Sequence, residues 1–354
     1  MRAVVIDAAR SQPQVREMPD PSAPAGGVVV RVEATGICRS DWHGWAGHDD
    51  DIAFPHVPGH ELAGEVVEVG AGVTRWRVGD RVTVPFVCGC GHCEWCLAGD
   101  AQVCPEQQQP GFTHWGSFAE YVALYAADAN LVALPDDVGF ATAASLGCRF
   151  ATAYRALVGR AAVREGEWVT VIGAGGVGLS SVMIAAALGA QVIAVDRNPE
   201  ALTAAAELGA RHTLVADGID VPAAVHDLVP GGSHIAIDAV GSESTCARAI
   251  LSLRRRGRLA QIGLLPPVMG HPRLPMSRVI GWELDLLGSH GMAASDYPAM
   301  MALIESGALQ PQRLVAGVIS LAEAAARLAT FDQATVTGIT IIDPHLGTEP
   351  SGRR

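Results

Sequence analysis

The chain has 354 residues, 49% of them hydrophobic, and a formal net charge of -12 at pH 7. A chain of this size can bury a large core and is expected to form two domains. All 25 basic residues are arginine, which excludes mechanisms that need a catalytic lysine, and the acidic charge argues against binding to nucleic acid.

Targeting and membrane signals are not evident in the sequence. No stretch of about 18 residues is both apolar and free of charges and glycines, and residues 1–7 are too short and too quickly charged for a signal peptide. We therefore expect a cytoplasmic protein without membrane contact. Five of the eight cysteines fall within residues 88–104, and in a reducing compartment such crowding indicates metal ligation rather than disulfides.

The first 150 residues are predicted to be rich in β-structure. Short β-branched runs at residues 3–6 and 28–34 are followed by strand-like segments at 64–69, 81–84 and 118–124, with glycines and prolines between them. This pattern predicts a small, partly open β-barrel.

Residues 38–43, which follow the second of these strands, read Cys-Arg-Ser-Asp-Trp-His. A thiolate can bind a soft metal ion, an arginine can bind an anion, and a serine and a histidine one turn apart can pass a proton. The stretch alone is weak evidence, because single cysteines and histidines are usually core or surface residues. Its interpretation depends on partners later in the chain.

Four cysteines with the spacing Cys-x2-Cys-x2-Cys-x7-Cys form the most specific motif of the first half. Four thiolates within fifteen residues make a closed tetrahedral set for Zn²⁺, as in a structural site. An iron–sulfur cluster is the main alternative, and Cys88 is too close to the first ligand to join the set. The predicted ligands are Cys90, Cys93, Cys96 and Cys104.

The second half begins with a nucleotide-binding pattern. A helical connection at 141–157 leads to a buried strand at 168–172, a Gly-x-Gly-x-x-Gly motif at 173–178, an apolar helix at 179–188 and a second strand that ends at Asp196. A glycine motif in this context is a strong signal for a dinucleotide site, since its backbone can approach a pyrophosphate at the helix N-terminus.

Asp196 favours NAD over NADP. Its carboxylate can accept hydrogen bonds from the adenosine ribose and would repel a 2′-phosphate, although the neighbouring Arg197 weakens this preference. The residues predicted to bind the cofactor in this unit are Gly173, Gly175, Gly176, Val177, Gly178, Asp196 and Arg197.

Strands and helices continue to alternate up to about residue 287. About six strands with helices between them predict an α/β fold with a doubly wound parallel sheet. The remainder has no second nucleotide motif and is expected to fold back onto the first domain, so that 1–149 and 288–354 form one domain and 150–287 the other. The later predicted elements are strands at 212–215, 234–239, 258–262, 283–287 and 338–342 and helices at 221–228, 243–253, 297–306 and 321–330.

With these features the chain resembles the zinc-dependent medium-chain alcohol dehydrogenases over essentially its whole length. The pattern Gly-His-Glu-x2-Gly-x5-Gly-x2-Val, which begins at Gly59, matches that family's zinc signature, the four-cysteine segment matches its structural zinc loop, and residues 38–43 match its catalytic-zinc segment. The resemblance implies a GroES-like catalytic domain with a structural zinc lobe, a Rossmann-type NAD domain, two zinc ions per chain, and a homo-oligomer, either a dimer or a tetramer.

The resemblance also implies roles for individual residues near the catalytic zinc. Cys38, His60 and Cys148 would hold the metal ion and leave a fourth position open, and Glu61 would be an alternative ligand. Asp41 would orient the imidazole of His60.

Further roles concern the proton, the cofactor and the substrate class. Ser40 and His43 would form a proton relay through the cofactor ribose, and Arg39 would contact the pyrophosphate. Polyol dehydrogenases of this fold tend to have a carboxylate where this chain has Cys148, which favours a simple alcohol dehydrogenase. One departure is the last strand, at 338–342, which lacks the basic residue that often contacts the cofactor phosphate in the family.

The expected reaction is the reversible NAD-linked oxidation of a primary or secondary alcohol to an aldehyde or ketone. Three alternatives are a polyol or other hydroxy-compound dehydrogenase, a zinc-free alkene reductase of the same fold, which the ligand cysteines disfavour, and a zinc-ribbon interaction protein. Four aromatic residues near the zinc-binding segments are candidate walls of a substrate pocket for an apolar or aromatic alcohol, with ordinary core packing as the alternative. They are Trp42, Trp45, Phe86 and Trp115.

Overall fold

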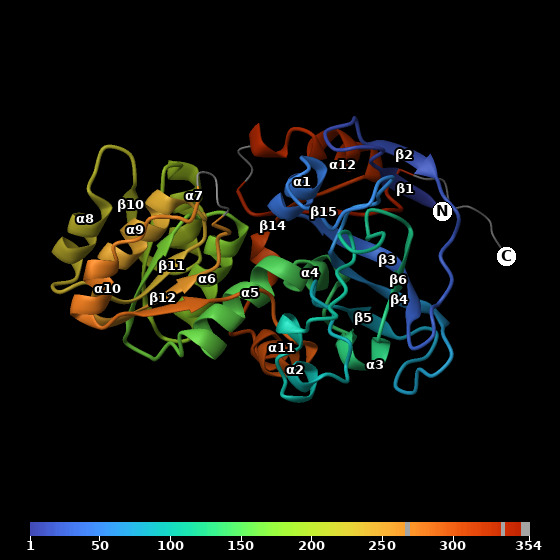
Figure 1. The fold of residues 1–354 in the computed structure, drawn as a ribbon, viewed down its shortest axis with the longest axis horizontal. Helices are drawn as coiled ribbons and strands as arrows, with labels where there is room; N and C mark the ends of the chain where they lie inside the picture. Colours follow the sequence, from blue (N-terminus) through green and yellow to red (C-terminus); the bar gives the residue numbers. More distant parts are fainter. Residues whose placement is uncertain (266–269, 334–336, 348–354) are drawn as a thin grey trace. The chain divides into compact units, whose positions relative to one another are not determined.

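The computed structural model describes residues 1–265, 270–333 and 337–347. Contacts divide the chain into two compact units (Figure 1): the first contains Met1–Cys148, Gly291–Ala299 and the chain from Pro311 on, and the second contains Arg149–His290 and Met300–Gln310. The sequence-based division put 1–149 and 288–354 in the first unit, so it differs mainly at 300–310 and by one to three residues at the two boundaries. Residues 300–310 carry buried apolar side chains, but the periodicity of the sequence does not show against which unit these side chains pack.

The first unit is built on a mixed sheet of seven strands, in the order β14-β15-β3-β4-β5-β7, with β6 paired to β3. The longest strand, β3, pairs with β4, β6 and β15 and is therefore buried at most positions. The expected β-rich first half is confirmed. The strands are β3 (Val28–Ile37), β4 (Glu61–Val69), β5 (Arg81–Thr83), β6 (Tyr121–Leu124), β7 (Val132–Ala133), β14 (Val315–Ile319) and β15 (Ile339–Ile342).

A separate hairpin pairs β1 (Arg2–Val5) with β2 (Gln14–Glu17), and α12 (Leu321–Leu328) packs against it. In α12 the buried side chains recur at helical spacing, at Leu321, Ala324, Ala325 and Leu328, and Ser320 caps the N-terminus together with Glu323. The shorter helices of this unit are α1 (Arg39–Trp45), α2 (Glu94–Leu97), α3 (Ala127–Asn130) and α4 (Phe140–Ala144); α11 (Tyr297–Glu305) has residues in both units.

The second unit contains a six-stranded parallel sheet in the order β10-β9-β8-β11-β12-β13 (Figure 1). The strand order reverses between β8 and β11, as in a doubly wound nucleotide-binding fold, so the prediction of this sheet is confirmed. The strands are β8 (Trp168–Ile172), β9 (Gln191–Asp196), β10 (Ala210–Val215), β11 (Ser233–Asp238), β12 (Leu253–Gln261) and β13 (Asp285–Gly288).

Helices cover this sheet in two groups. The helix α6 (Gly176–Ala187) packs against β8, β9 and α7 (Pro199–Glu207), whereas α9 (Glu243–Leu251) packs against β11, β12, α8 (Val221–Leu228) and α10 (Met276–Trp282). Eight of the twelve residues of α6 are buried, from Gly178 to Ala185, which explains why its sequence has no strongly polar side. Neither α7 nor α10 was predicted.

The connection between the units is more irregular than the single helix expected at 141–157. After α4 the backbone forms a π-helical turn at Leu146–Phe150, continues as α5 (Ala151–Tyr154), and widens again at Arg155–Arg160. Such widened turns are rare and occur often at functional sites. One of them contains Cys148.

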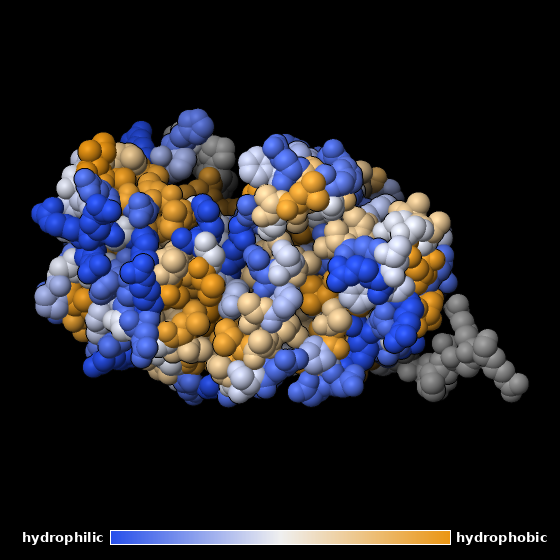
Figure 2. Space-filling view, turned by 90° about the horizontal axis from the view of Figure 1, so that it is seen from below, coloured by the Kyte–Doolittle hydropathy of each residue, from blue (hydrophilic) through white to orange (hydrophobic). Residues whose placement is uncertain are grey.

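Among the residues that the structure describes, no helix is both long enough and apolar enough to cross a membrane. On the face shown in Figure 2, hydrophobic and hydrophilic residues are intermingled. Exposed hydrophobic side chains belong to separate elements, for example Leu97 on α2, Ile280 on α10 and Val318 on β14.

Candidate metal and cofactor sites

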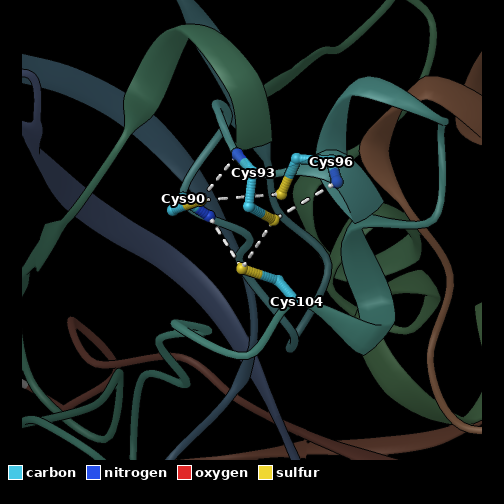
Figure 3. A group of neighbouring side chains, drawn as sticks. All are labelled: Cys90, Cys93, Cys96 and Cys104. Carbon is cyan, nitrogen blue, oxygen red and sulfur yellow. Dashed lines mark hydrogen bonds between the residues drawn. The ribbon is translucent and has the colours of Figure 1, made fainter.

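The four cysteines of the predicted structural site converge in one lobe of the first unit (Figure 3). Their sulfur atoms all lie within 4.8 Å of one another. Backbone N–H groups of Cys90, Cys93 and Cys96 point at sulfur atoms of the cluster, at 3.4, 3.4 and 3.5 Å from Cys104, Cys90 and Cys93 respectively. This arrangement stabilises negatively charged sulfur.

The distances between the sulfur atoms fit a tetrahedral zinc site. Cys90 Sγ lies 3.9 Å from Cys96 Sγ and Cys93 Sγ lies 3.7 Å from Cys104 Sγ, while four sulfurs at about 2.3 Å from a central Zn²⁺ would be separated by about 3.8 Å. All four cysteines are free thiols. Cys88 lies outside the group: it is buried, its Sγ donates to the carbonyl of Pro85, and burial raises its pKa to about 12.

A second group of possible metal ligands brings together Cys38, His60, Glu61 and Cys148. Their ligand atoms also lie within 4.8 Å of one another; Cys38, His60 and Glu61 are buried and Cys148 is half-buried. Two sulfurs, an imidazole nitrogen and a carboxylate oxygen form a donor set that suits Zn²⁺. The structure thus assembles the four residues that the sequence predicted for a catalytic metal site.

The strands β3 and β4 position two of these ligands. They run antiparallel, with Gly36 opposite Glu61, so Cys38, just after β3, and His60, just before β4, lie at the same end of the pair. The turn before His60 depends on Gly59, whose φ is +106° and where a Cβ atom would lie 2.4 Å from the ring of Phe118. No other residue fits this turn without displacing the ligand.

Asp41 connects the two segments through its carboxylate. One oxygen accepts hydrogen bonds from His60 Nδ1 at 2.9 Å and from the backbone N–H of Gly59 at 3.1 Å, and the other accepts from the backbone N–H of Cys38 at 2.8 Å. Because Nδ1 is engaged, the other ring nitrogen, Nε2, faces the ligand group, where it is buried without a hydrogen-bond partner among the described residues. A buried nitrogen of this kind fits a metal ligand.

The environment of His60 makes metal binding compete with protonation. Burial opposes the charged imidazole, but the charges and hydrogen bonds of Asp41 and Cys38 together outweigh burial and hold the pKa of His60 well above its usual value. A metal ion at Nε2 must displace that proton, so its affinity should rise with pH.

Replacing Asp41 with Asn is expected to weaken metal binding at this group by about 10- to 100-fold, as seen when carboxylate partners of ligating histidines are changed. The amide keeps the shape but loses the negative charge that favours the correct ring orientation. Competition with a chelator, followed by metal analysis, measures the change. The four-cysteine site is the internal control, since its affinity should not change.

The predicted relay residues lie next to this group. Ser40 Oγ is 3.8 Å from Cys38 Sγ, and His43 Nδ1 lies 2.9 Å from Nδ1 of His48, which is exposed. Burial, together with the nearby charges of His48 and Arg39, lowers the pKa of His43. The sequence interpretation did not include His48.

Of the four aromatic residues predicted to line a substrate pocket, two lie against histidines of the candidate site. The ring of Phe86 lies 5.9 Å from that of His60, and Trp42 packs edge-on against His43 at 4.9 Å. The other two candidates are tied to backbone carbonyls: Trp45 Nε1 donates to Ser11 and Trp115 Nε1 to Pro55. Trp42 and Trp45 also pack against a hydrophobic cluster of the first unit, as in the alternative interpretation of core packing.

Two residues near the ligand group were missed by sequence reasoning. Phe112 packs 5.1 Å from the His60 ring. Tyr297 is fully buried, and burial, followed by the nearby charges of Cys148, Cys88 and Glu61, raises its pKa well above the usual value. Neither residue belongs to a motif, so only the folded chain brings them to the site.

The glycine-rich segment of the second unit forms a tight turn at the N-terminus of α6. Gly173 has a φ of +96°, and a Cβ on Gly178 would lie 1.7 Å from the carbonyl oxygen of Gly173, so both positions require glycine. At Gly175 a Cβ would meet no atom within 4 Å, which leaves this backbone open to a ligand. The turn therefore fits a pyrophosphate.

Asp196, at the end of β9, faces this turn. Its Oδ2 accepts a hydrogen bond from the backbone N–H of Ala174 at 2.6 Å and its Oδ1 accepts one from Asn198 at 2.8 Å. Arg197 is exposed. Val177 lies in the first turn of α6, so the motif residues and Asp196 lie together at the carboxyl ends of β8 and β9.

Comparisons with known proteins match most of both units. The alcohol dehydrogenase GroES-like domain matches residues 24–136, and the model described as zinc-binding dehydrogenase matches residues 176–306. An alcohol dehydrogenase of Geobacillus stearothermophilus is 38% identical over 270 residues, which cover 75% of this chain and 78% of that protein. A sorbitol dehydrogenase of Halalkalibacterium halodurans is 30% identical over 318 residues, or 87% and 89% of the two chains.

The fold is matched by a solved structure described as an NAD-dependent alcohol dehydrogenase. It superposes with a TM-score of 0.88 at 31% identity and covers 97% of this chain and 99% of that chain. The matched GroES-like domain contains the four-cysteine lobe and three of the four ligands of the second group. The matched zinc-binding dehydrogenase domain begins at Gly176, the first residue of α6.

Proposed function

Because the chain belongs to the zinc-dependent medium-chain dehydrogenase/reductase family and is an alcohol or polyol dehydrogenase of that family, we propose that it catalyses the reversible NAD-linked oxidation of a primary or secondary alcohol to an aldehyde or ketone. Its GroES-like domain and doubly wound sheet are those of the family. The observation that carries the proposal is the buried group of Cys38, His60, Glu61 and Cys148.

This group is proposed to hold a catalytic zinc ion through Cys38, His60 and Cys148, with Glu61 as an alternative ligand. Bound here, zinc would supply Lewis acidity that lowers the pKa of an alcohol hydroxyl, and NAD would supply the hydride acceptor. The protein holds the ligands in place through Asp41, and the rings of Phe86 and Phe112 shield His60 from water, which strengthens electrostatic interactions at this point.

The proton released from the alcohol is proposed to leave through Ser40 and His43. The Ser40 hydroxyl, beside Cys38, can both accept and donate a proton. The lowered pKa of His43 keeps its imidazole neutral at physiological pH, so that it can accept the proton. The hydrogen bond to exposed His48 would then continue the path to solvent.

The cofactor is proposed to bind along the turn at Gly173, Gly175, Gly176, Val177 and Gly178, with Arg39 as a phosphate contact. Asp196 would bind the adenosine ribose and favour NAD. The backbone N–H groups of Ala174 and Asn198 fix the position of its carboxylate, which would repel a 2′-phosphate.

The test of the proposed function is an assay of a panel of alcohols and carbonyls with each cofactor. We expect turnover with NAD(H) and a kcat/KM for NADP(H) about 10- to 100-fold lower, since the ribose loses hydrogen bonds to a charged group. Arg197, which is exposed, should reduce this preference only slightly. Equal use of both cofactors would contradict the role of Asp196, and absence of turnover with every substrate would contradict the proposed function.

The panel also decides between a simple alcohol and a polyol. The similarity to a sorbitol dehydrogenase keeps a polyol as the second candidate, while the thiol of Cys148 and the apolar rings around His60 support an apolar or aromatic alcohol. Two zinc ions per chain and a homo-oligomer are part of the proposal.

A further inference from the structure

A third group of possible metal ligands lies in the four-cysteine lobe, and the proposed mechanism does not use it. It consists of Cys90, His92 and Glu106, whose ligand atoms lie within 4.8 Å of one another. His92 Nε2 lies 4.0 Å from Glu106 Oε2, and both side chains are exposed. An exposed ion pair contributes little to stability, so stability does not explain why this pair lies beside a cysteine of the structural site.

The backbone brings Glu106 opposite Cys90. Cys88 and Gln108 form an antiparallel bridge in which each backbone N–H donates to the other residue's carbonyl at 2.8 Å. Cys90 and Glu106 lie two residues from this bridge on its same side, which places them on one face. A hollow of about 390 Å³ lies here, and all four residues contribute to its lining. An ion at this place would have room for water ligands.

Backbone hydrogen bonds to the sulfur atoms anchor the other parts of the group. A turn at Gly91, whose φ is +83°, lets the backbone N–H of His92 donate to Cys90 Sγ. The backbone N–H of Glu106 donates to Cys104 Sγ. The segments that enclose the four sulfurs therefore also carry the imidazole and the carboxylate, and zinc in the four-cysteine site would hold both segments in place.

The charge of the lobe favours a further cation. Four thiolates around one Zn²⁺ carry a net charge of about -2, and Glu106 adds a negative charge beside them. The chain has no lysine, and no arginine stands between Arg81 and Arg149. The segment that forms the lobe therefore contains no permanently charged cation to offset these negative charges.

We propose that Cys90, His92 and Glu106 bind a further divalent ion of the zinc type, with the Cys90 thiolate shared between this ion and the structural zinc. The inference goes beyond the proposed function but rests on the structural zinc that is part of it. Sulfur, imidazole and carboxylate suit Zn²⁺ and related transition metals, whereas Mg²⁺ and Ca²⁺ prefer oxygen ligands. Because His92 and Glu106 are exposed, this ion exchanges with solvent while the ion enclosed by four thiolates is retained.

Cobalt(II) is the probe that tests the proposal on the zinc-loaded protein. It binds such sites less tightly than Zn²⁺, so it should leave the bound zinc in place, and a thiolate ligand gives it a charge-transfer absorption band. The protein is dialysed, titrated with Co²⁺ and analysed for both metals, as wild type and as the variants His92→Ala and Glu106→Gln. The matched control is Glu94→Gln, which removes the same charge from an exposed position of the same lobe but outside the group.

We expect the wild type to bind about one Co²⁺ per chain with a charge-transfer band and to keep about two zinc ions. His92→Ala and Glu106→Gln should each weaken cobalt binding by about tenfold or more, because each removes one of three protein ligands. Both variants should keep their zinc, which separates loss of this site from unfolding of the lobe. Glu94→Gln should stay within about twofold of the wild type, and excess Mg²⁺ should not compete with Co²⁺.

Cobalt that binds without a charge-transfer band, or that Glu94→Gln weakens as much as Glu106→Gln does, would overturn the proposal, because general surface charge would then hold the ion. Release of one zinc ion for each cobalt bound would also overturn it, since cobalt would occupy an existing zinc site. A wild type without zinc in the lobe would overturn this inference and the proposed count of two zinc ions. A protein that binds cobalt as described but oxidises no alcohol would contradict only the proposed function.

Discussion

Replacing Cys38 or Cys148 with Ser is expected to lower kcat/KM for alcohol oxidation by about 1,000-fold or more, because Lewis-acid stabilisation contributes several kcal/mol and each 1.4 kcal/mol is about tenfold in rate. Serine is nearly the same size as cysteine, but its hydroxyl does not ionise in the way that a thiol does, so one ligand of the buried group is lost. Metal analysis should find about one zinc ion per chain instead of about two.

NADH binding is the second readout for these variants. The glycine-rich turn and Asp196 belong to the second unit, which has its own sheet and core, so NADH should bind to both serine variants with little change. Retained turnover in either variant would contradict the assignment of the catalytic ligands.

Cys88 offers a matched control in the same unit. It is a buried free thiol that belongs to neither ligand group, so Cys88→Ala should keep about two zinc ions and nearly full activity. A loss as large as that of Cys38→Ser would show that any buried thiol change disrupts the unit, and would remove the argument for specific ligands.

Elements with strong local signals could be predicted from the sequence. The predicted strand 168–172 and helix 221–228 agree with Trp168–Ile172 and Val221–Leu228. The strand is a run of apolar residues that ends at a glycine turn, and the helix has Asp220 as a side-chain cap and a proline in its first turn. In both cases local chemistry and tertiary packing favour the same structure.

Elements that depend on distant partners were missed. β2 has mostly exposed, polar residues and is a strand only because it pairs with β1. β14 contains a glycine and exposed positions, and forms by parallel pairing with β15. α7 differs from these strands, because Asn198 caps its N-terminus and Pro199 stands in its first turn, and both are local helix-start signals.

The candidate site likewise contains residues that local motifs identify and residues that only the folded chain brings to the site. Residues within motifs, such as Cys38 and His60 of the ligand group and the glycines of the turn before α6, were identified from spacing and resemblance, and the fold brings the metal ligands together. Phe112 and Tyr297 belong to no motif. Phe112 packs beside the His60 ring and Tyr297 lies near Cys148 and Glu61 only in the folded chain, and no periodicity in the sequence encodes these contacts.

The fold of the four-cysteine lobe is expected to depend on a bound metal ion. No residue from Cys90 to Ala101 is buried, and Trp95 and Leu97 are 45% and 76% exposed. A segment with so little buried apolar surface cannot offset its loss of conformational entropy. Structural zinc supplies folding free energy directly, about 10 kcal/mol or more in isolated zinc-binding peptides.

Replacing Cys93 or Cys96 with Ser should therefore release about one zinc ion per chain and unfold the lobe while the two sheets remain intact. The segment 90–104 should become the first site of proteolytic cleavage, and NADH binding should persist because the nucleotide-binding sheet lies in the other unit. The control is His92→Ala, since His92 lies within the loop but is 73% exposed at its side chain. Serine variants that keep both zinc ions and resist proteolysis as the wild type does would show that this lobe folds without its metal ion.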